Sequence, residues 1–311
     1  MRTERYVDQY GLHSKGIWIS RLQLSDWNFL RIPILPPPLA EQEYIAYYLD
    51  KKTEQIDKAI AQKEQMIELL KERKQILINR AVTRGLNPDV PLKDSSVDWI
   101  GEIPEHWDVR RLKYCANVNV SNVDKHSRKL EDEVKLCNYV DVYKNDFILE
   151  DINFMKSTAT EDDIRKYSLK LGDVIITKDS EDWKDIGVPA LVRHEEKNLI
   201  CGYHLAILRS KKDKVTGDYL FQLLQSLKIK IQFNVRANGV TRYGISYGAI
   251  SGAWVLLPPV IEQKEIADYV EYNTAKIDKA IFQKQEEIER LKEYKSTLID
   301  SAVTGKICLV N

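Results

Sequence analysis

Hydrophobic positions recur with alternating spacings of four and three residues along two long stretches of the chain. Neither stretch, 39–84 or 260–304, contains a proline or glycine, and a proline pair lies just before each of them. The mean period of 3.5 residues predicts two long helices of the left-handed coiled-coil type, each needing a partner helix. The hydrophobic seam consists of Ile56, Ile60, Ile67, Leu70 and Leu77 in the first stretch, and of Ile277, Ile281, Ile288, Leu291 and Leu298 in the second.

The two stretches are copies of one another. Shifted by 221 residues, 37–83 falls on 258–304 with 26 of 47 positions identical and no gap. Because so long a period excludes a solenoid, we interpret the chain as a duplicated helical module with a different domain between the copies. The two helices can pair antiparallel with each other, which would make them a spacer. A coiled coil with a purely structural role is the alternative interpretation.

The pattern changes between the helices. Residues 86–107 are rich in Pro, Gly, Asp and Ser, which predicts an irregular linker. From 108 to 256, short β-type runs such as 134–142 accompany a helical pattern at 218–233, which predicts an α/β domain. The expected fold class is therefore α+β, with one α/β domain flanked by two long helices that pair as an antiparallel coiled coil. The predicted parts are a remnant of another domain at 1–31, helical spacers at 32–85 and 257–304, the linker at 86–107, the α/β domain at 108–256 and a tail at 305–311.

Composition narrows the class of protein. The 311 residues are 43% hydrophobic and 30% charged, and 47 basic residues balance 47 acidic ones. These values argue against a disordered chain and suffice for about two domains. No apolar run approaches the ~20 residues of a membrane span, and the first twenty residues lack a secretory signal. Four scattered cysteines fit a reducing compartment. We therefore expect a cytoplasmic protein with no membrane partner.

Catalytic signatures are few. The chain has no Gly-x-x-x-x-Gly-Lys phosphate loop, no Gly-x-Gly-x-x-Gly dinucleotide motif and no Asn/Asp-Pro-Pro-aromatic motif of amino-methyltransferases. Cys201 and His204 give a single two-ligand match to a metal site, for which a plain loop is the better interpretation. Asp173, Asp182 and Lys184 loosely fit the acid, acid-x-Lys pattern of metal-dependent nucleases, which arises easily by chance in a charged chain. We therefore expect no catalytic residue and no bound metal.

A basic window follows in the second half of the α/β domain. No acidic residue occurs between Asp218 and Glu262, whereas four basic residues do. Basic side chains contact phosphates, and Arg and Asn can form two-point hydrogen bonds with base edges, so the window favours DNA binding. A solvated basic face beside a glycine-rich loop is the alternative. The polar and basic residues of interest are Lys228, Lys230, Arg236, Asn238, Arg242, Tyr243 and Ser246.

Several segments together resemble one protein family. ILPPPLAEQ and VLLPPVIEQ lead into the long helices, which share IDKAI and end in LI-x-x-AVT. The segment DSSVDWIGEIPEHWDVRRLKY at 94–114 precedes the α/β domain, and LGDVIITKD at 171–179 and GVTRYGISYGAI at 239–250 lie within it. These motifs resemble those of the specificity subunits of type I restriction-modification systems. The resemblance covers nearly all of the chain from about Gly16 onward.

The resemblance implies a role for each part. In that family a target recognition domain reads half of a bipartite sequence in double-stranded DNA, and paired helices set the gap between the halves. Modification (methyltransferase) subunits and restriction subunits dock on the helices and carry out adenine methylation and ATP-dependent cleavage. S-adenosylmethionine, ATP and Mg are thus expected on those partners, and no cofactor on this chain. The resemblance adds Lys178 and Ser180 to the DNA-binding candidates of the basic window.

The chain departs from the family pattern at its N-terminus. A full specificity subunit has two recognition domains, but here only one is complete, and residues 1–31 resemble the last strands of another. Lys15-Gly16-Ile17 is a weak match to the stretch from Arg242 to Ile245. Two interpretations of the chain stay open. It is either a truncated gene product or a half-subunit that forms a homodimer and reads a palindromic bipartite site. Two other functions also stay open, a coiled-coil scaffold without DNA recognition and a nuclease built on Asp173, Asp182 and Lys184.

Overall fold

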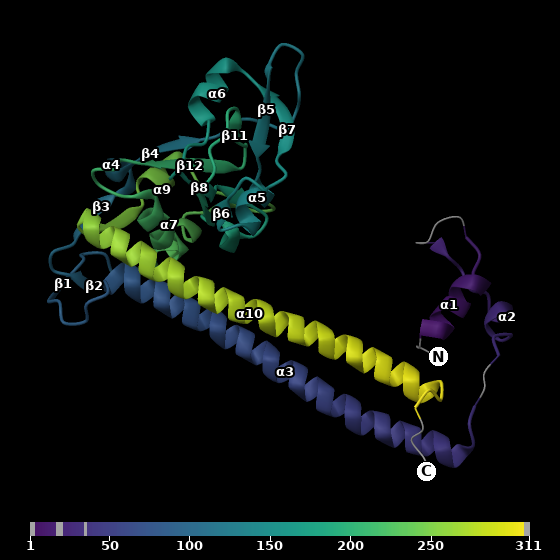
Figure 1. The fold of residues 1–311 in the computed structure, drawn as a ribbon. Helices are drawn as coiled ribbons and strands as arrows, with labels where there is room; N and C mark the ends of the chain where they lie inside the picture. The colour runs from purple at the N-terminus through teal and green to yellow at the C-terminus, as the bar shows by residue number, and fades with distance from the viewer. Residues whose placement is uncertain (1–3, 17–20, 34–35, 308–311) are drawn as a thin grey trace. The chain divides into compact units, whose positions relative to one another are not determined.

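The computed structural model describes residues 4–16, 21–33 and 36–307. The chain divides into two compact units (Figure 1). One comprises Met1–Lys71 with Ile277–Asn311, and the other comprises Glu72–Lys276. Two long helices, α3 (Leu39–Arg84) and α10 (Val260–Val303), contribute to both units. The domain boundaries at 108 and 256 therefore differ from those of the second unit, which also holds the ends of both long helices.

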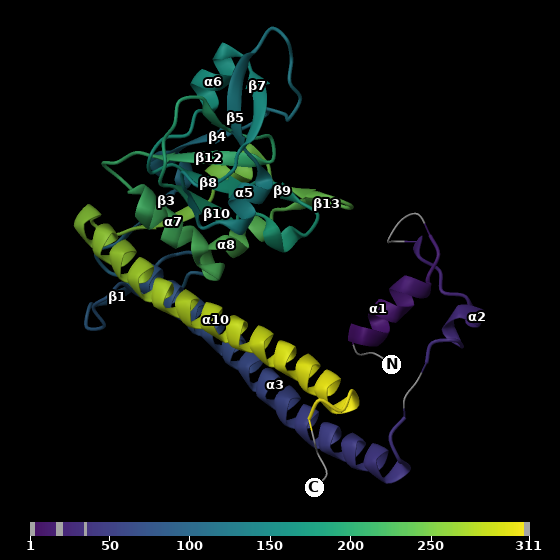
Figure 2. The same cartoon turned by 45° about the vertical axis from the view of Figure 1, so that its right-hand side comes forward.

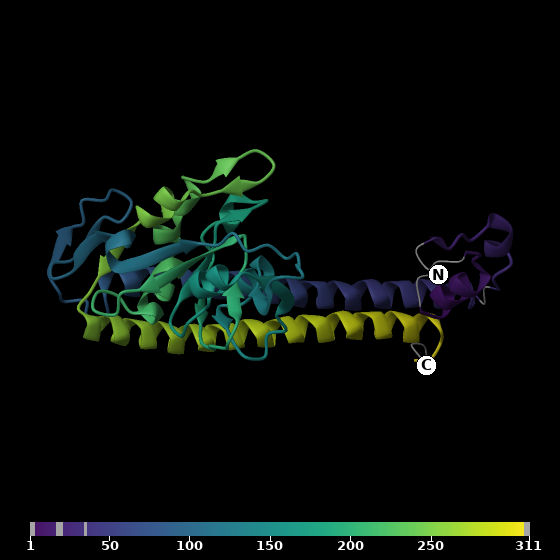
Figure 3. The same ribbon diagram turned by 90° about the horizontal axis from the view of Figure 1, so that it is seen from above.

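Within the first unit, α3 and α10 run antiparallel (Figure 3). Lys63 forms an ion pair with Glu287, and Lys295 Nζ lies 2.6 Å from Asp57 Oδ2. The earlier residue on α3 therefore pairs with the later residue on α10, as in antiparallel helices. The predicted seam lies in the contact. Its buried members are Ile56, Ile67, Ile277, Ile288 and Leu298, and its half-buried members are Ile60, Leu70, Leu77, Ile281 and Leu291.

The described part of the N-terminal segment contains helices α1 (Glu4–His13) and α2 (Asp26–Phe29) and one antiparallel bridge between Lys15 and Gln23. Ile32 is the one buried hydrophobic residue among the described side chains of 7–33, which means that the segment has no core of its own. Apart from that bridge, the described residues 4–33 contain no strand, so the expected last strands are not formed there. Ile17, part of the match to Arg242, lies outside the described residues.

The segment before α3 nevertheless repeats the layout of the segment before α10. The hydroxyl of Ser25 accepts the backbone N–H of Asn28 at the start of α2. At the same offset of 221 residues, the hydroxyl of Ser246 accepts the backbone N–H of Ala249 at the start of α9 (Tyr247–Ser251). This register places Arg21, rather than Lys15, opposite Arg242. The duplication thus extends upstream of the long helices.

The second unit is built on a five-stranded sheet of order β4-β12-β8-β10-β6 and a three-stranded sheet of order β11-β5-β7 (Figure 2). All neighbours in the larger sheet are antiparallel except β10 and β6. Its strands are β4 (Ala116–Val120), β6 (Phe147–Ile148), β8 (Val174–Thr177), β10 (Pro189–Val192) and β12 (Leu205–Ser210). The smaller sheet contains β5 (Asp132–Cys137), β7 (Met155–Ala159) and β11 (Leu199–Cys201). Strands β8 and β10 are buried at every position, as central strands covered on both faces should be.

Short helices cover these sheets and connect their strands. They are α4 (Leu112–Cys115), α5 (Tyr139–Lys144), α6 (Glu161–Tyr167), α7 (Gly217–Gln225), α8 (Leu227–Asn234) and the 3₁₀ turn η2 (Trp183–Asp185). The single helix expected over 218–233 is wrong, because Ser226 has an extended backbone that separates α7 from α8. The β-type run expected at 134–142 ends early, because Asn138 and Asp141 form a capping box that starts α5.

The irregular linker expected at 86–107 is also wrong. It holds an antiparallel hairpin of β1 (Leu92–Asp94) and β2 (Glu102–Pro104). Val97, Ile100, Ile103 and Trp107 are buried in the main core of the unit. Polar residues and prolines dominate the composition of this segment, so the few apolar positions that anchor the hairpin do not stand out in the sequence.

The same core contains residues from the ends of both long helices. Ile78, Ala81 and Val82 come from α3, and Ile266 and Val270 come from α10. Strand β3 (Asp108–Arg111) pairs antiparallel with β15 (Trp254–Leu257) and joins the beginning of the α/β domain to its end. No helix in the described part of the chain is both long and apolar enough to cross a membrane.

Candidate nucleic-acid interface

A small sheet of order β13-β14-β9 carries several of the DNA-binding candidates (Figure 2). It joins β13 (Asn238–Gly239) and β14 (Tyr243–Gly244) to β9 (Asp179–Ser180), with Tyr243 opposite Ser180. Gly239 is required in this hairpin, because a Cβ there would collide with the carbonyl oxygen of Arg242. The hairpin brings the basic window of the sequence against the end of the LGDVIITKD motif.

One carboxylate at this junction holds three nitrogen-bearing side chains. Lys178 Nζ lies 2.8 Å from Asp179 Oδ2, Arg242 Nη2 lies 3.2 Å from Asp179 Oδ1, and the Nδ1 atom of His204 is also paired with Oδ1. We call Lys178, Asp179, His204 and Arg242 the Asp179 cluster. The side chain of Asp179 is only 16% exposed, whereas that of Arg242 is 52% exposed. The cluster therefore buries its negative charge and presents a positive one.

The charge of the cluster depends on His204. Burial lowers the pKa of this imidazole, and Arg242 and Lys178 act in the same direction, although Asp179 opposes them. His204 is therefore neutral at pH 7, and two cations against one carboxylate leave the cluster with a net positive charge. A net positive charge on an exposed hairpin suits contact with phosphate.

Aromatic and hydroxyl groups surround the Asp179 cluster. Lys178 Nζ lies 4.4 Å from the centre of the Tyr203 ring, and the Tyr139 hydroxyl is 3.0 Å from Ser180 Oγ. Tyr139 in turn stacks on Tyr143, with ring centres 5.5 Å apart. Hydroxyl groups beside basic side chains add donors and acceptors for phosphates and base edges.

A second group of candidates lies in an open polar groove of about 640 Å³, lined in part by Arg111, Arg236, Asn238 and Ser246. Arg236 donates to the Ala249 carbonyl at 3.4 Å, and Asn238 donates to the Arg236 carbonyl at 3.0 Å. The Ser246 hydroxyl accepts a backbone N–H as the cap of α9, so its lone pairs are partly used within the fold. The groove is positively charged through its two arginines.

Lys228 and Lys230 do not join either group. They lie on α8, where burial lowers the pKa of Lys230 and Asp185 opposes this shift. Among the described residues, no hydrogen bond or ion pair links either lysine to the hairpin. Helix α8 instead supports the neighbouring loop, because Asn234 Nδ2 donates to the carbonyls of Trp183 and Ile186. These two candidates therefore lack the structural support that Lys178 and Arg242 have.

The residues of the nuclease alternative are not brought together. Asp173 precedes β8 and is bound to Arg209, whereas Asp182 follows β9 and accepts the backbone N–H of Lys184. Cys201 is fully buried, with its pKa raised by burial, and His204 is bound to Asp179. Among the described residues there is no group of three or more His, Cys, Asp or Glu side chains that could hold a metal ion.

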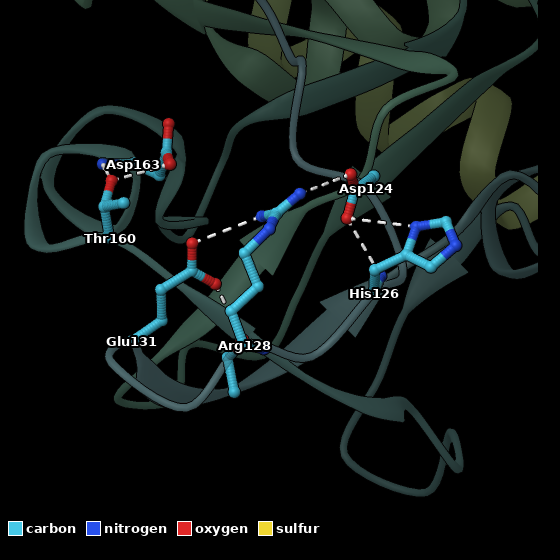
Figure 4. A network of polar contacts seen from close by, with 7 residues as sticks. Asp124, His126, Arg128, Glu131, Thr160 and Asp163 are labelled. Carbon is cyan, nitrogen blue, oxygen red and sulfur yellow. Dashed lines mark hydrogen bonds and ion pairs between the residues drawn. The ribbon is translucent and has the colours of Figure 1, made fainter.

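Not every basic side chain of the domain is available to a polyanion. Figure 4 shows Arg128 between two carboxylates, with Nη2 at 2.9 Å from Asp124 and Nη1 at 3.2 Å from Glu131. The backbone N–H of Arg128 also donates to Thr158 Oγ1, so the network holds this loop against β7. The positive charge of Arg128 is thus neutralised by two acids, in contrast to the Asp179 cluster, where two cations share one acid.

The profile of the Type I restriction modification DNA specificity domain matches residues 104–290, more than half of the chain. The chain belongs to this family. The Type I restriction enzyme MjaVIII specificity subunit of Methanocaldococcus jannaschii is 27% identical over 310 residues, which cover 96% of this chain and 67% of that protein. The EcoKI specificity subunit of Escherichia coli is 25% identical over 310 residues, which cover 98% and 64%. The chain thus spans about two thirds of the length of these curated relatives.

Solved structures agree on the fold. A chain described in work on complex assembly and conformational transition of the type I R-M system gives a TM-score of 0.74 at 16% identity, covering 98% of this chain and 70% of that one. The HsdS subunit from Thermoanaerobacter tengcongensis gives a TM-score of 0.52 at 16% identity, covering 98% and 68%. The α+β class with long flanking helices is confirmed. The relatives are specificity subunits rather than catalytic ones, as expected for a chain that is not an enzyme.

Four residues of the candidate interface could not be recognised in the sequence. Asp179 directly follows Lys178 in the motif, but an acid is not an obvious part of a DNA-binding site. In the sequence His204 suggests only a metal ligand, and Tyr203 and Arg111 lie outside the basic window. Arg111 lies with its guanidinium 3.4 Å from the centre of the Trp254 ring, a placement set by the pairing of β3 with β15.

Proposed function

We propose that this chain is the DNA sequence-recognition subunit of a type I restriction-modification complex and that its domain reads one half of a bipartite site in double-stranded DNA. Membership in the specificity-domain family supports this role. The observation that carries it is the Asp179 cluster, in which Lys178 and Arg242 meet on an exposed hairpin over a single buried acid. In the part of the chain that the structure describes, no comparable convergence of side chains supports catalysis.

The cluster suggests a division of labour on DNA. Arg242 is the more exposed cation, and its planar guanidinium can form two hydrogen bonds with the O6 and N7 atoms of a guanine. Lys178 is largely enclosed between Asp179 and Tyr203, so it acts as a fixed positive charge for a phosphate. Arg236 and Arg111 in the neighbouring groove extend the positive surface for the DNA backbone. Arg242 then reads the base sequence, and the other cations fix the position of the domain along the DNA through phosphate contacts.

The helices provide the surface for partners in this proposal. Exposed aromatic residues on α10, including Tyr272, Phe282 and Tyr294, offer apolar contacts along its outer side. Modification subunits would dock there, and restriction subunits would join the assembly. S-adenosylmethionine, ATP and Mg would bind to those subunits, and the complex would work in the cytoplasm.

Copurification with the genomically adjacent methyltransferase subunit tests this role. Light scattering should give a stable complex, and the complex should bind duplex DNA with an affinity that falls steeply as salt rises. Arg242→Ala should weaken binding to the preferred sequence. Arg128→Ala is a matched control, because Arg128 is already neutralised by Asp124 and Glu131 and should tolerate the change. The mass of the complex also reports whether the chain forms a homodimer.

A coiled-coil scaffold predicts a different result from the same experiment. Its association with partners would be insensitive to salt and independent of DNA, and Arg242→Ala would have no effect. Mg-dependent cleavage by the purified chain, abolished by Lys184→Ala, would instead favour the nuclease. Either result would refute the specificity-subunit proposal.

A further inference from the structure

The turn of the β13–β14 hairpin carries an exposed hydrophobic side chain. Val240 is 91% exposed and is the first residue of the turn that joins the two strands. Residues 238–242 are all exposed, whereas Ile245, just after β14, is buried. Figure 2 shows β13 at the outer edge of the domain. The hairpin therefore projects its turn, and Val240 with it, away from the core.

The base of the hairpin is fixed, so the position of the turn is defined. The backbone N–H of Ile245 donates to the carbonyl of Lys178 at 2.9 Å, and β14 pairs with β9 on its other side. A Cβ at Gly239 would collide with the carbonyl oxygen of Arg242, so the two strands approach closely where the turn begins. A two-stranded ribbon of this kind fits the major groove of B-DNA, which is about 12 Å wide.

Neither the core nor the turn requires a hydrophobic residue at position 240. Val240 belongs to neither of the two hydrophobic clusters of the domain, and tight turns favour Gly, Asn, Asp and Ser instead. A single exposed valine is common on protein surfaces, so the argument depends on its position. Val240 lies two residues before Arg242, on a hairpin that contains basic residues and no acidic one. The partner of this surface is DNA in the proposed function.

A branched hydrophobic side chain can recognise one feature of the major groove, the C5 methyl group of thymine. The other groups on the base edges are hydrogen-bond donors and acceptors, which valine cannot satisfy. Contact between the valine methyl groups and a thymine methyl group removes apolar surface from water on both sides, which stabilises the complex. Uracil has the same hydrogen-bonding groups as thymine without the methyl group, so it isolates this contact.

We propose that Val240 is a specificity-determining residue, which selects thymine at one position of the DNA site through its methyl group. The inference rests on the proposed function and adds a second base to the one that Arg242 reads. The Cα atoms of Val240 and Arg242 are at most ~7 Å apart, since they are two residues apart in the chain, and base pairs stack ~3.4 Å apart. Because the arginine side chain adds reach, the thymine should lie within about three base pairs of the one that Arg242 contacts.

Uracil substitution tests this inference in the complex with the methyltransferase subunit. The preferred duplex is selected from a random pool, and each of its thymines is then replaced singly by deoxyuridine. At one thymine this replacement should weaken binding by about two- to fivefold, the loss expected when one methyl group is no longer buried. Val240→Ala should weaken binding to the thymine duplex by a similar factor and should bind the thymine and uracil duplexes equally.

The two changes should not be additive, because both remove the same contact. Val7→Ala is the matched control, since Val7 is also an exposed valine, at 54%, and lies on α1 in the other unit. This variant should retain the full affinity for the thymine duplex and the full loss on the uracil duplex.

Three results would overturn the role of Val240. The preferred site could lack a thymine near the base pair affected by Arg242→Ala, or every uracil duplex could bind as tightly as the thymine duplex. An equal loss with Val240→Ala on both duplexes would mark the valine as a contact without base preference. If Arg242→Ala still weakens binding to the preferred sequence, the proposed function stands and only the inference fails. Absence of any sequence-specific binding would overturn both.

Discussion

The carboxylate of Asp173 and the guanidinium of Arg209 form a two-point ion pair, with Nε–Oδ1 and Nη2–Oδ2 distances of 2.9 and 2.7 Å. Asp173 is 2% exposed and also accepts the backbone N–H of Lys170, and Arg209 donates to the Ser168 carbonyl. The pair ties β12 to the turn before β8. Asp173, a candidate for metal chemistry in the sequence, is therefore a structural residue.

Replacement of Arg209 by alanine should strongly destabilise the second unit, because it leaves the buried charge of Asp173 without its partner. The expected loss is about 3–5 kcal/mol in the free energy of unfolding, measured by urea denaturation. Arg165→Ala is the control, since Arg165 is 81% exposed and forms an exposed ion pair with Asp162 on the same helix. It should cost less than about 1 kcal/mol. Equal losses in the two variants would contradict a structural role for the Asp173–Arg209 pair.

The helix pair should lose stability in acid through Glu287. Hydrogen bonds from Lys63 and Lys284 lower the pKa of Glu287 to about 2. Because the unfolded carboxyl titrates near its ordinary value of 4.5, its contribution is complete above that pH and is lost as pH falls towards 2. Melting temperatures over this range should decline less steeply for Glu287→Gln than for the unmodified chain. Glu293→Gln, at an exposed site on the same helix, should retain the original slope.

Arg242 and Lys178 should have different effects on DNA recognition. If Arg242 reads a guanine, Arg242→Ala should cost about 1–3 kcal/mol on the preferred site and relax discrimination at one base pair. Lys178→Ala should weaken binding to all sequences alike. It should also make the binding constant less dependent on salt concentration, by the amount expected for the loss of about one phosphate contact. Binding titrations against a set of singly substituted duplexes separate these outcomes. A uniform loss with Arg242→Ala would reassign that residue to a phosphate.

His204 should make DNA binding depend on pH. Its pKa is lowered by burial, so the imidazole is neutral at pH 7 and gains a proton only in more acidic solution. The groups around it are Asp179, Arg242, Lys178 and Tyr203. Protonation adds a positive charge to the cluster, and the charged imidazole competes with Arg242 for Asp179, so both effects favour DNA. Affinity should therefore rise by about two- to tenfold as pH falls below the ordinary His value of ~6.5.

His204→Gln is the decisive variant for this dependence. Glutamine retains a donor and an acceptor near Asp179 but cannot take up a proton in this pH range. Its DNA affinity should stay level where that of the unmodified chain rises. The same pH dependence in both proteins would assign the titration to another group.

The sequence predicted the helical part of the chain well, because the information there is local. A seam such as Ile56, Ile60 and Ile67 repeats along one helix face, and the same pattern returns at Ile277, Ile281 and Ile288. The structure places every one of these residues in buried or half-buried positions. Because the two matched helices belong to one chain and are separated by a globular domain, they can pair antiparallel with each other.

The site was harder to predict, because its residues meet through short, non-local pairings. Lys178 and Arg242 come together only because two-residue strands, β9 and β14, lie next to each other. Neither strand is long enough to give an alternating pattern. Lys228 and Lys230 belong to the same basic window, yet they lie on a helix that supports the core. Charge in the sequence points to the basic window as a whole, and it does not separate the residues of the hairpin from those of the helix.

The pairing of β3 with β15 has an evolutionary consequence. Because these strands lie side by side, the two points at which the chain enters and leaves the intervening domain are neighbours. Such an arrangement lets the residues between Val109 and Leu256 be exchanged as a cassette without altering the spacing of the helices. If the domain reads DNA as proposed, recombination between genes that encode the same helices would change its DNA preference in one step. New specificity could thus arise without point mutations having to accumulate in the hairpin.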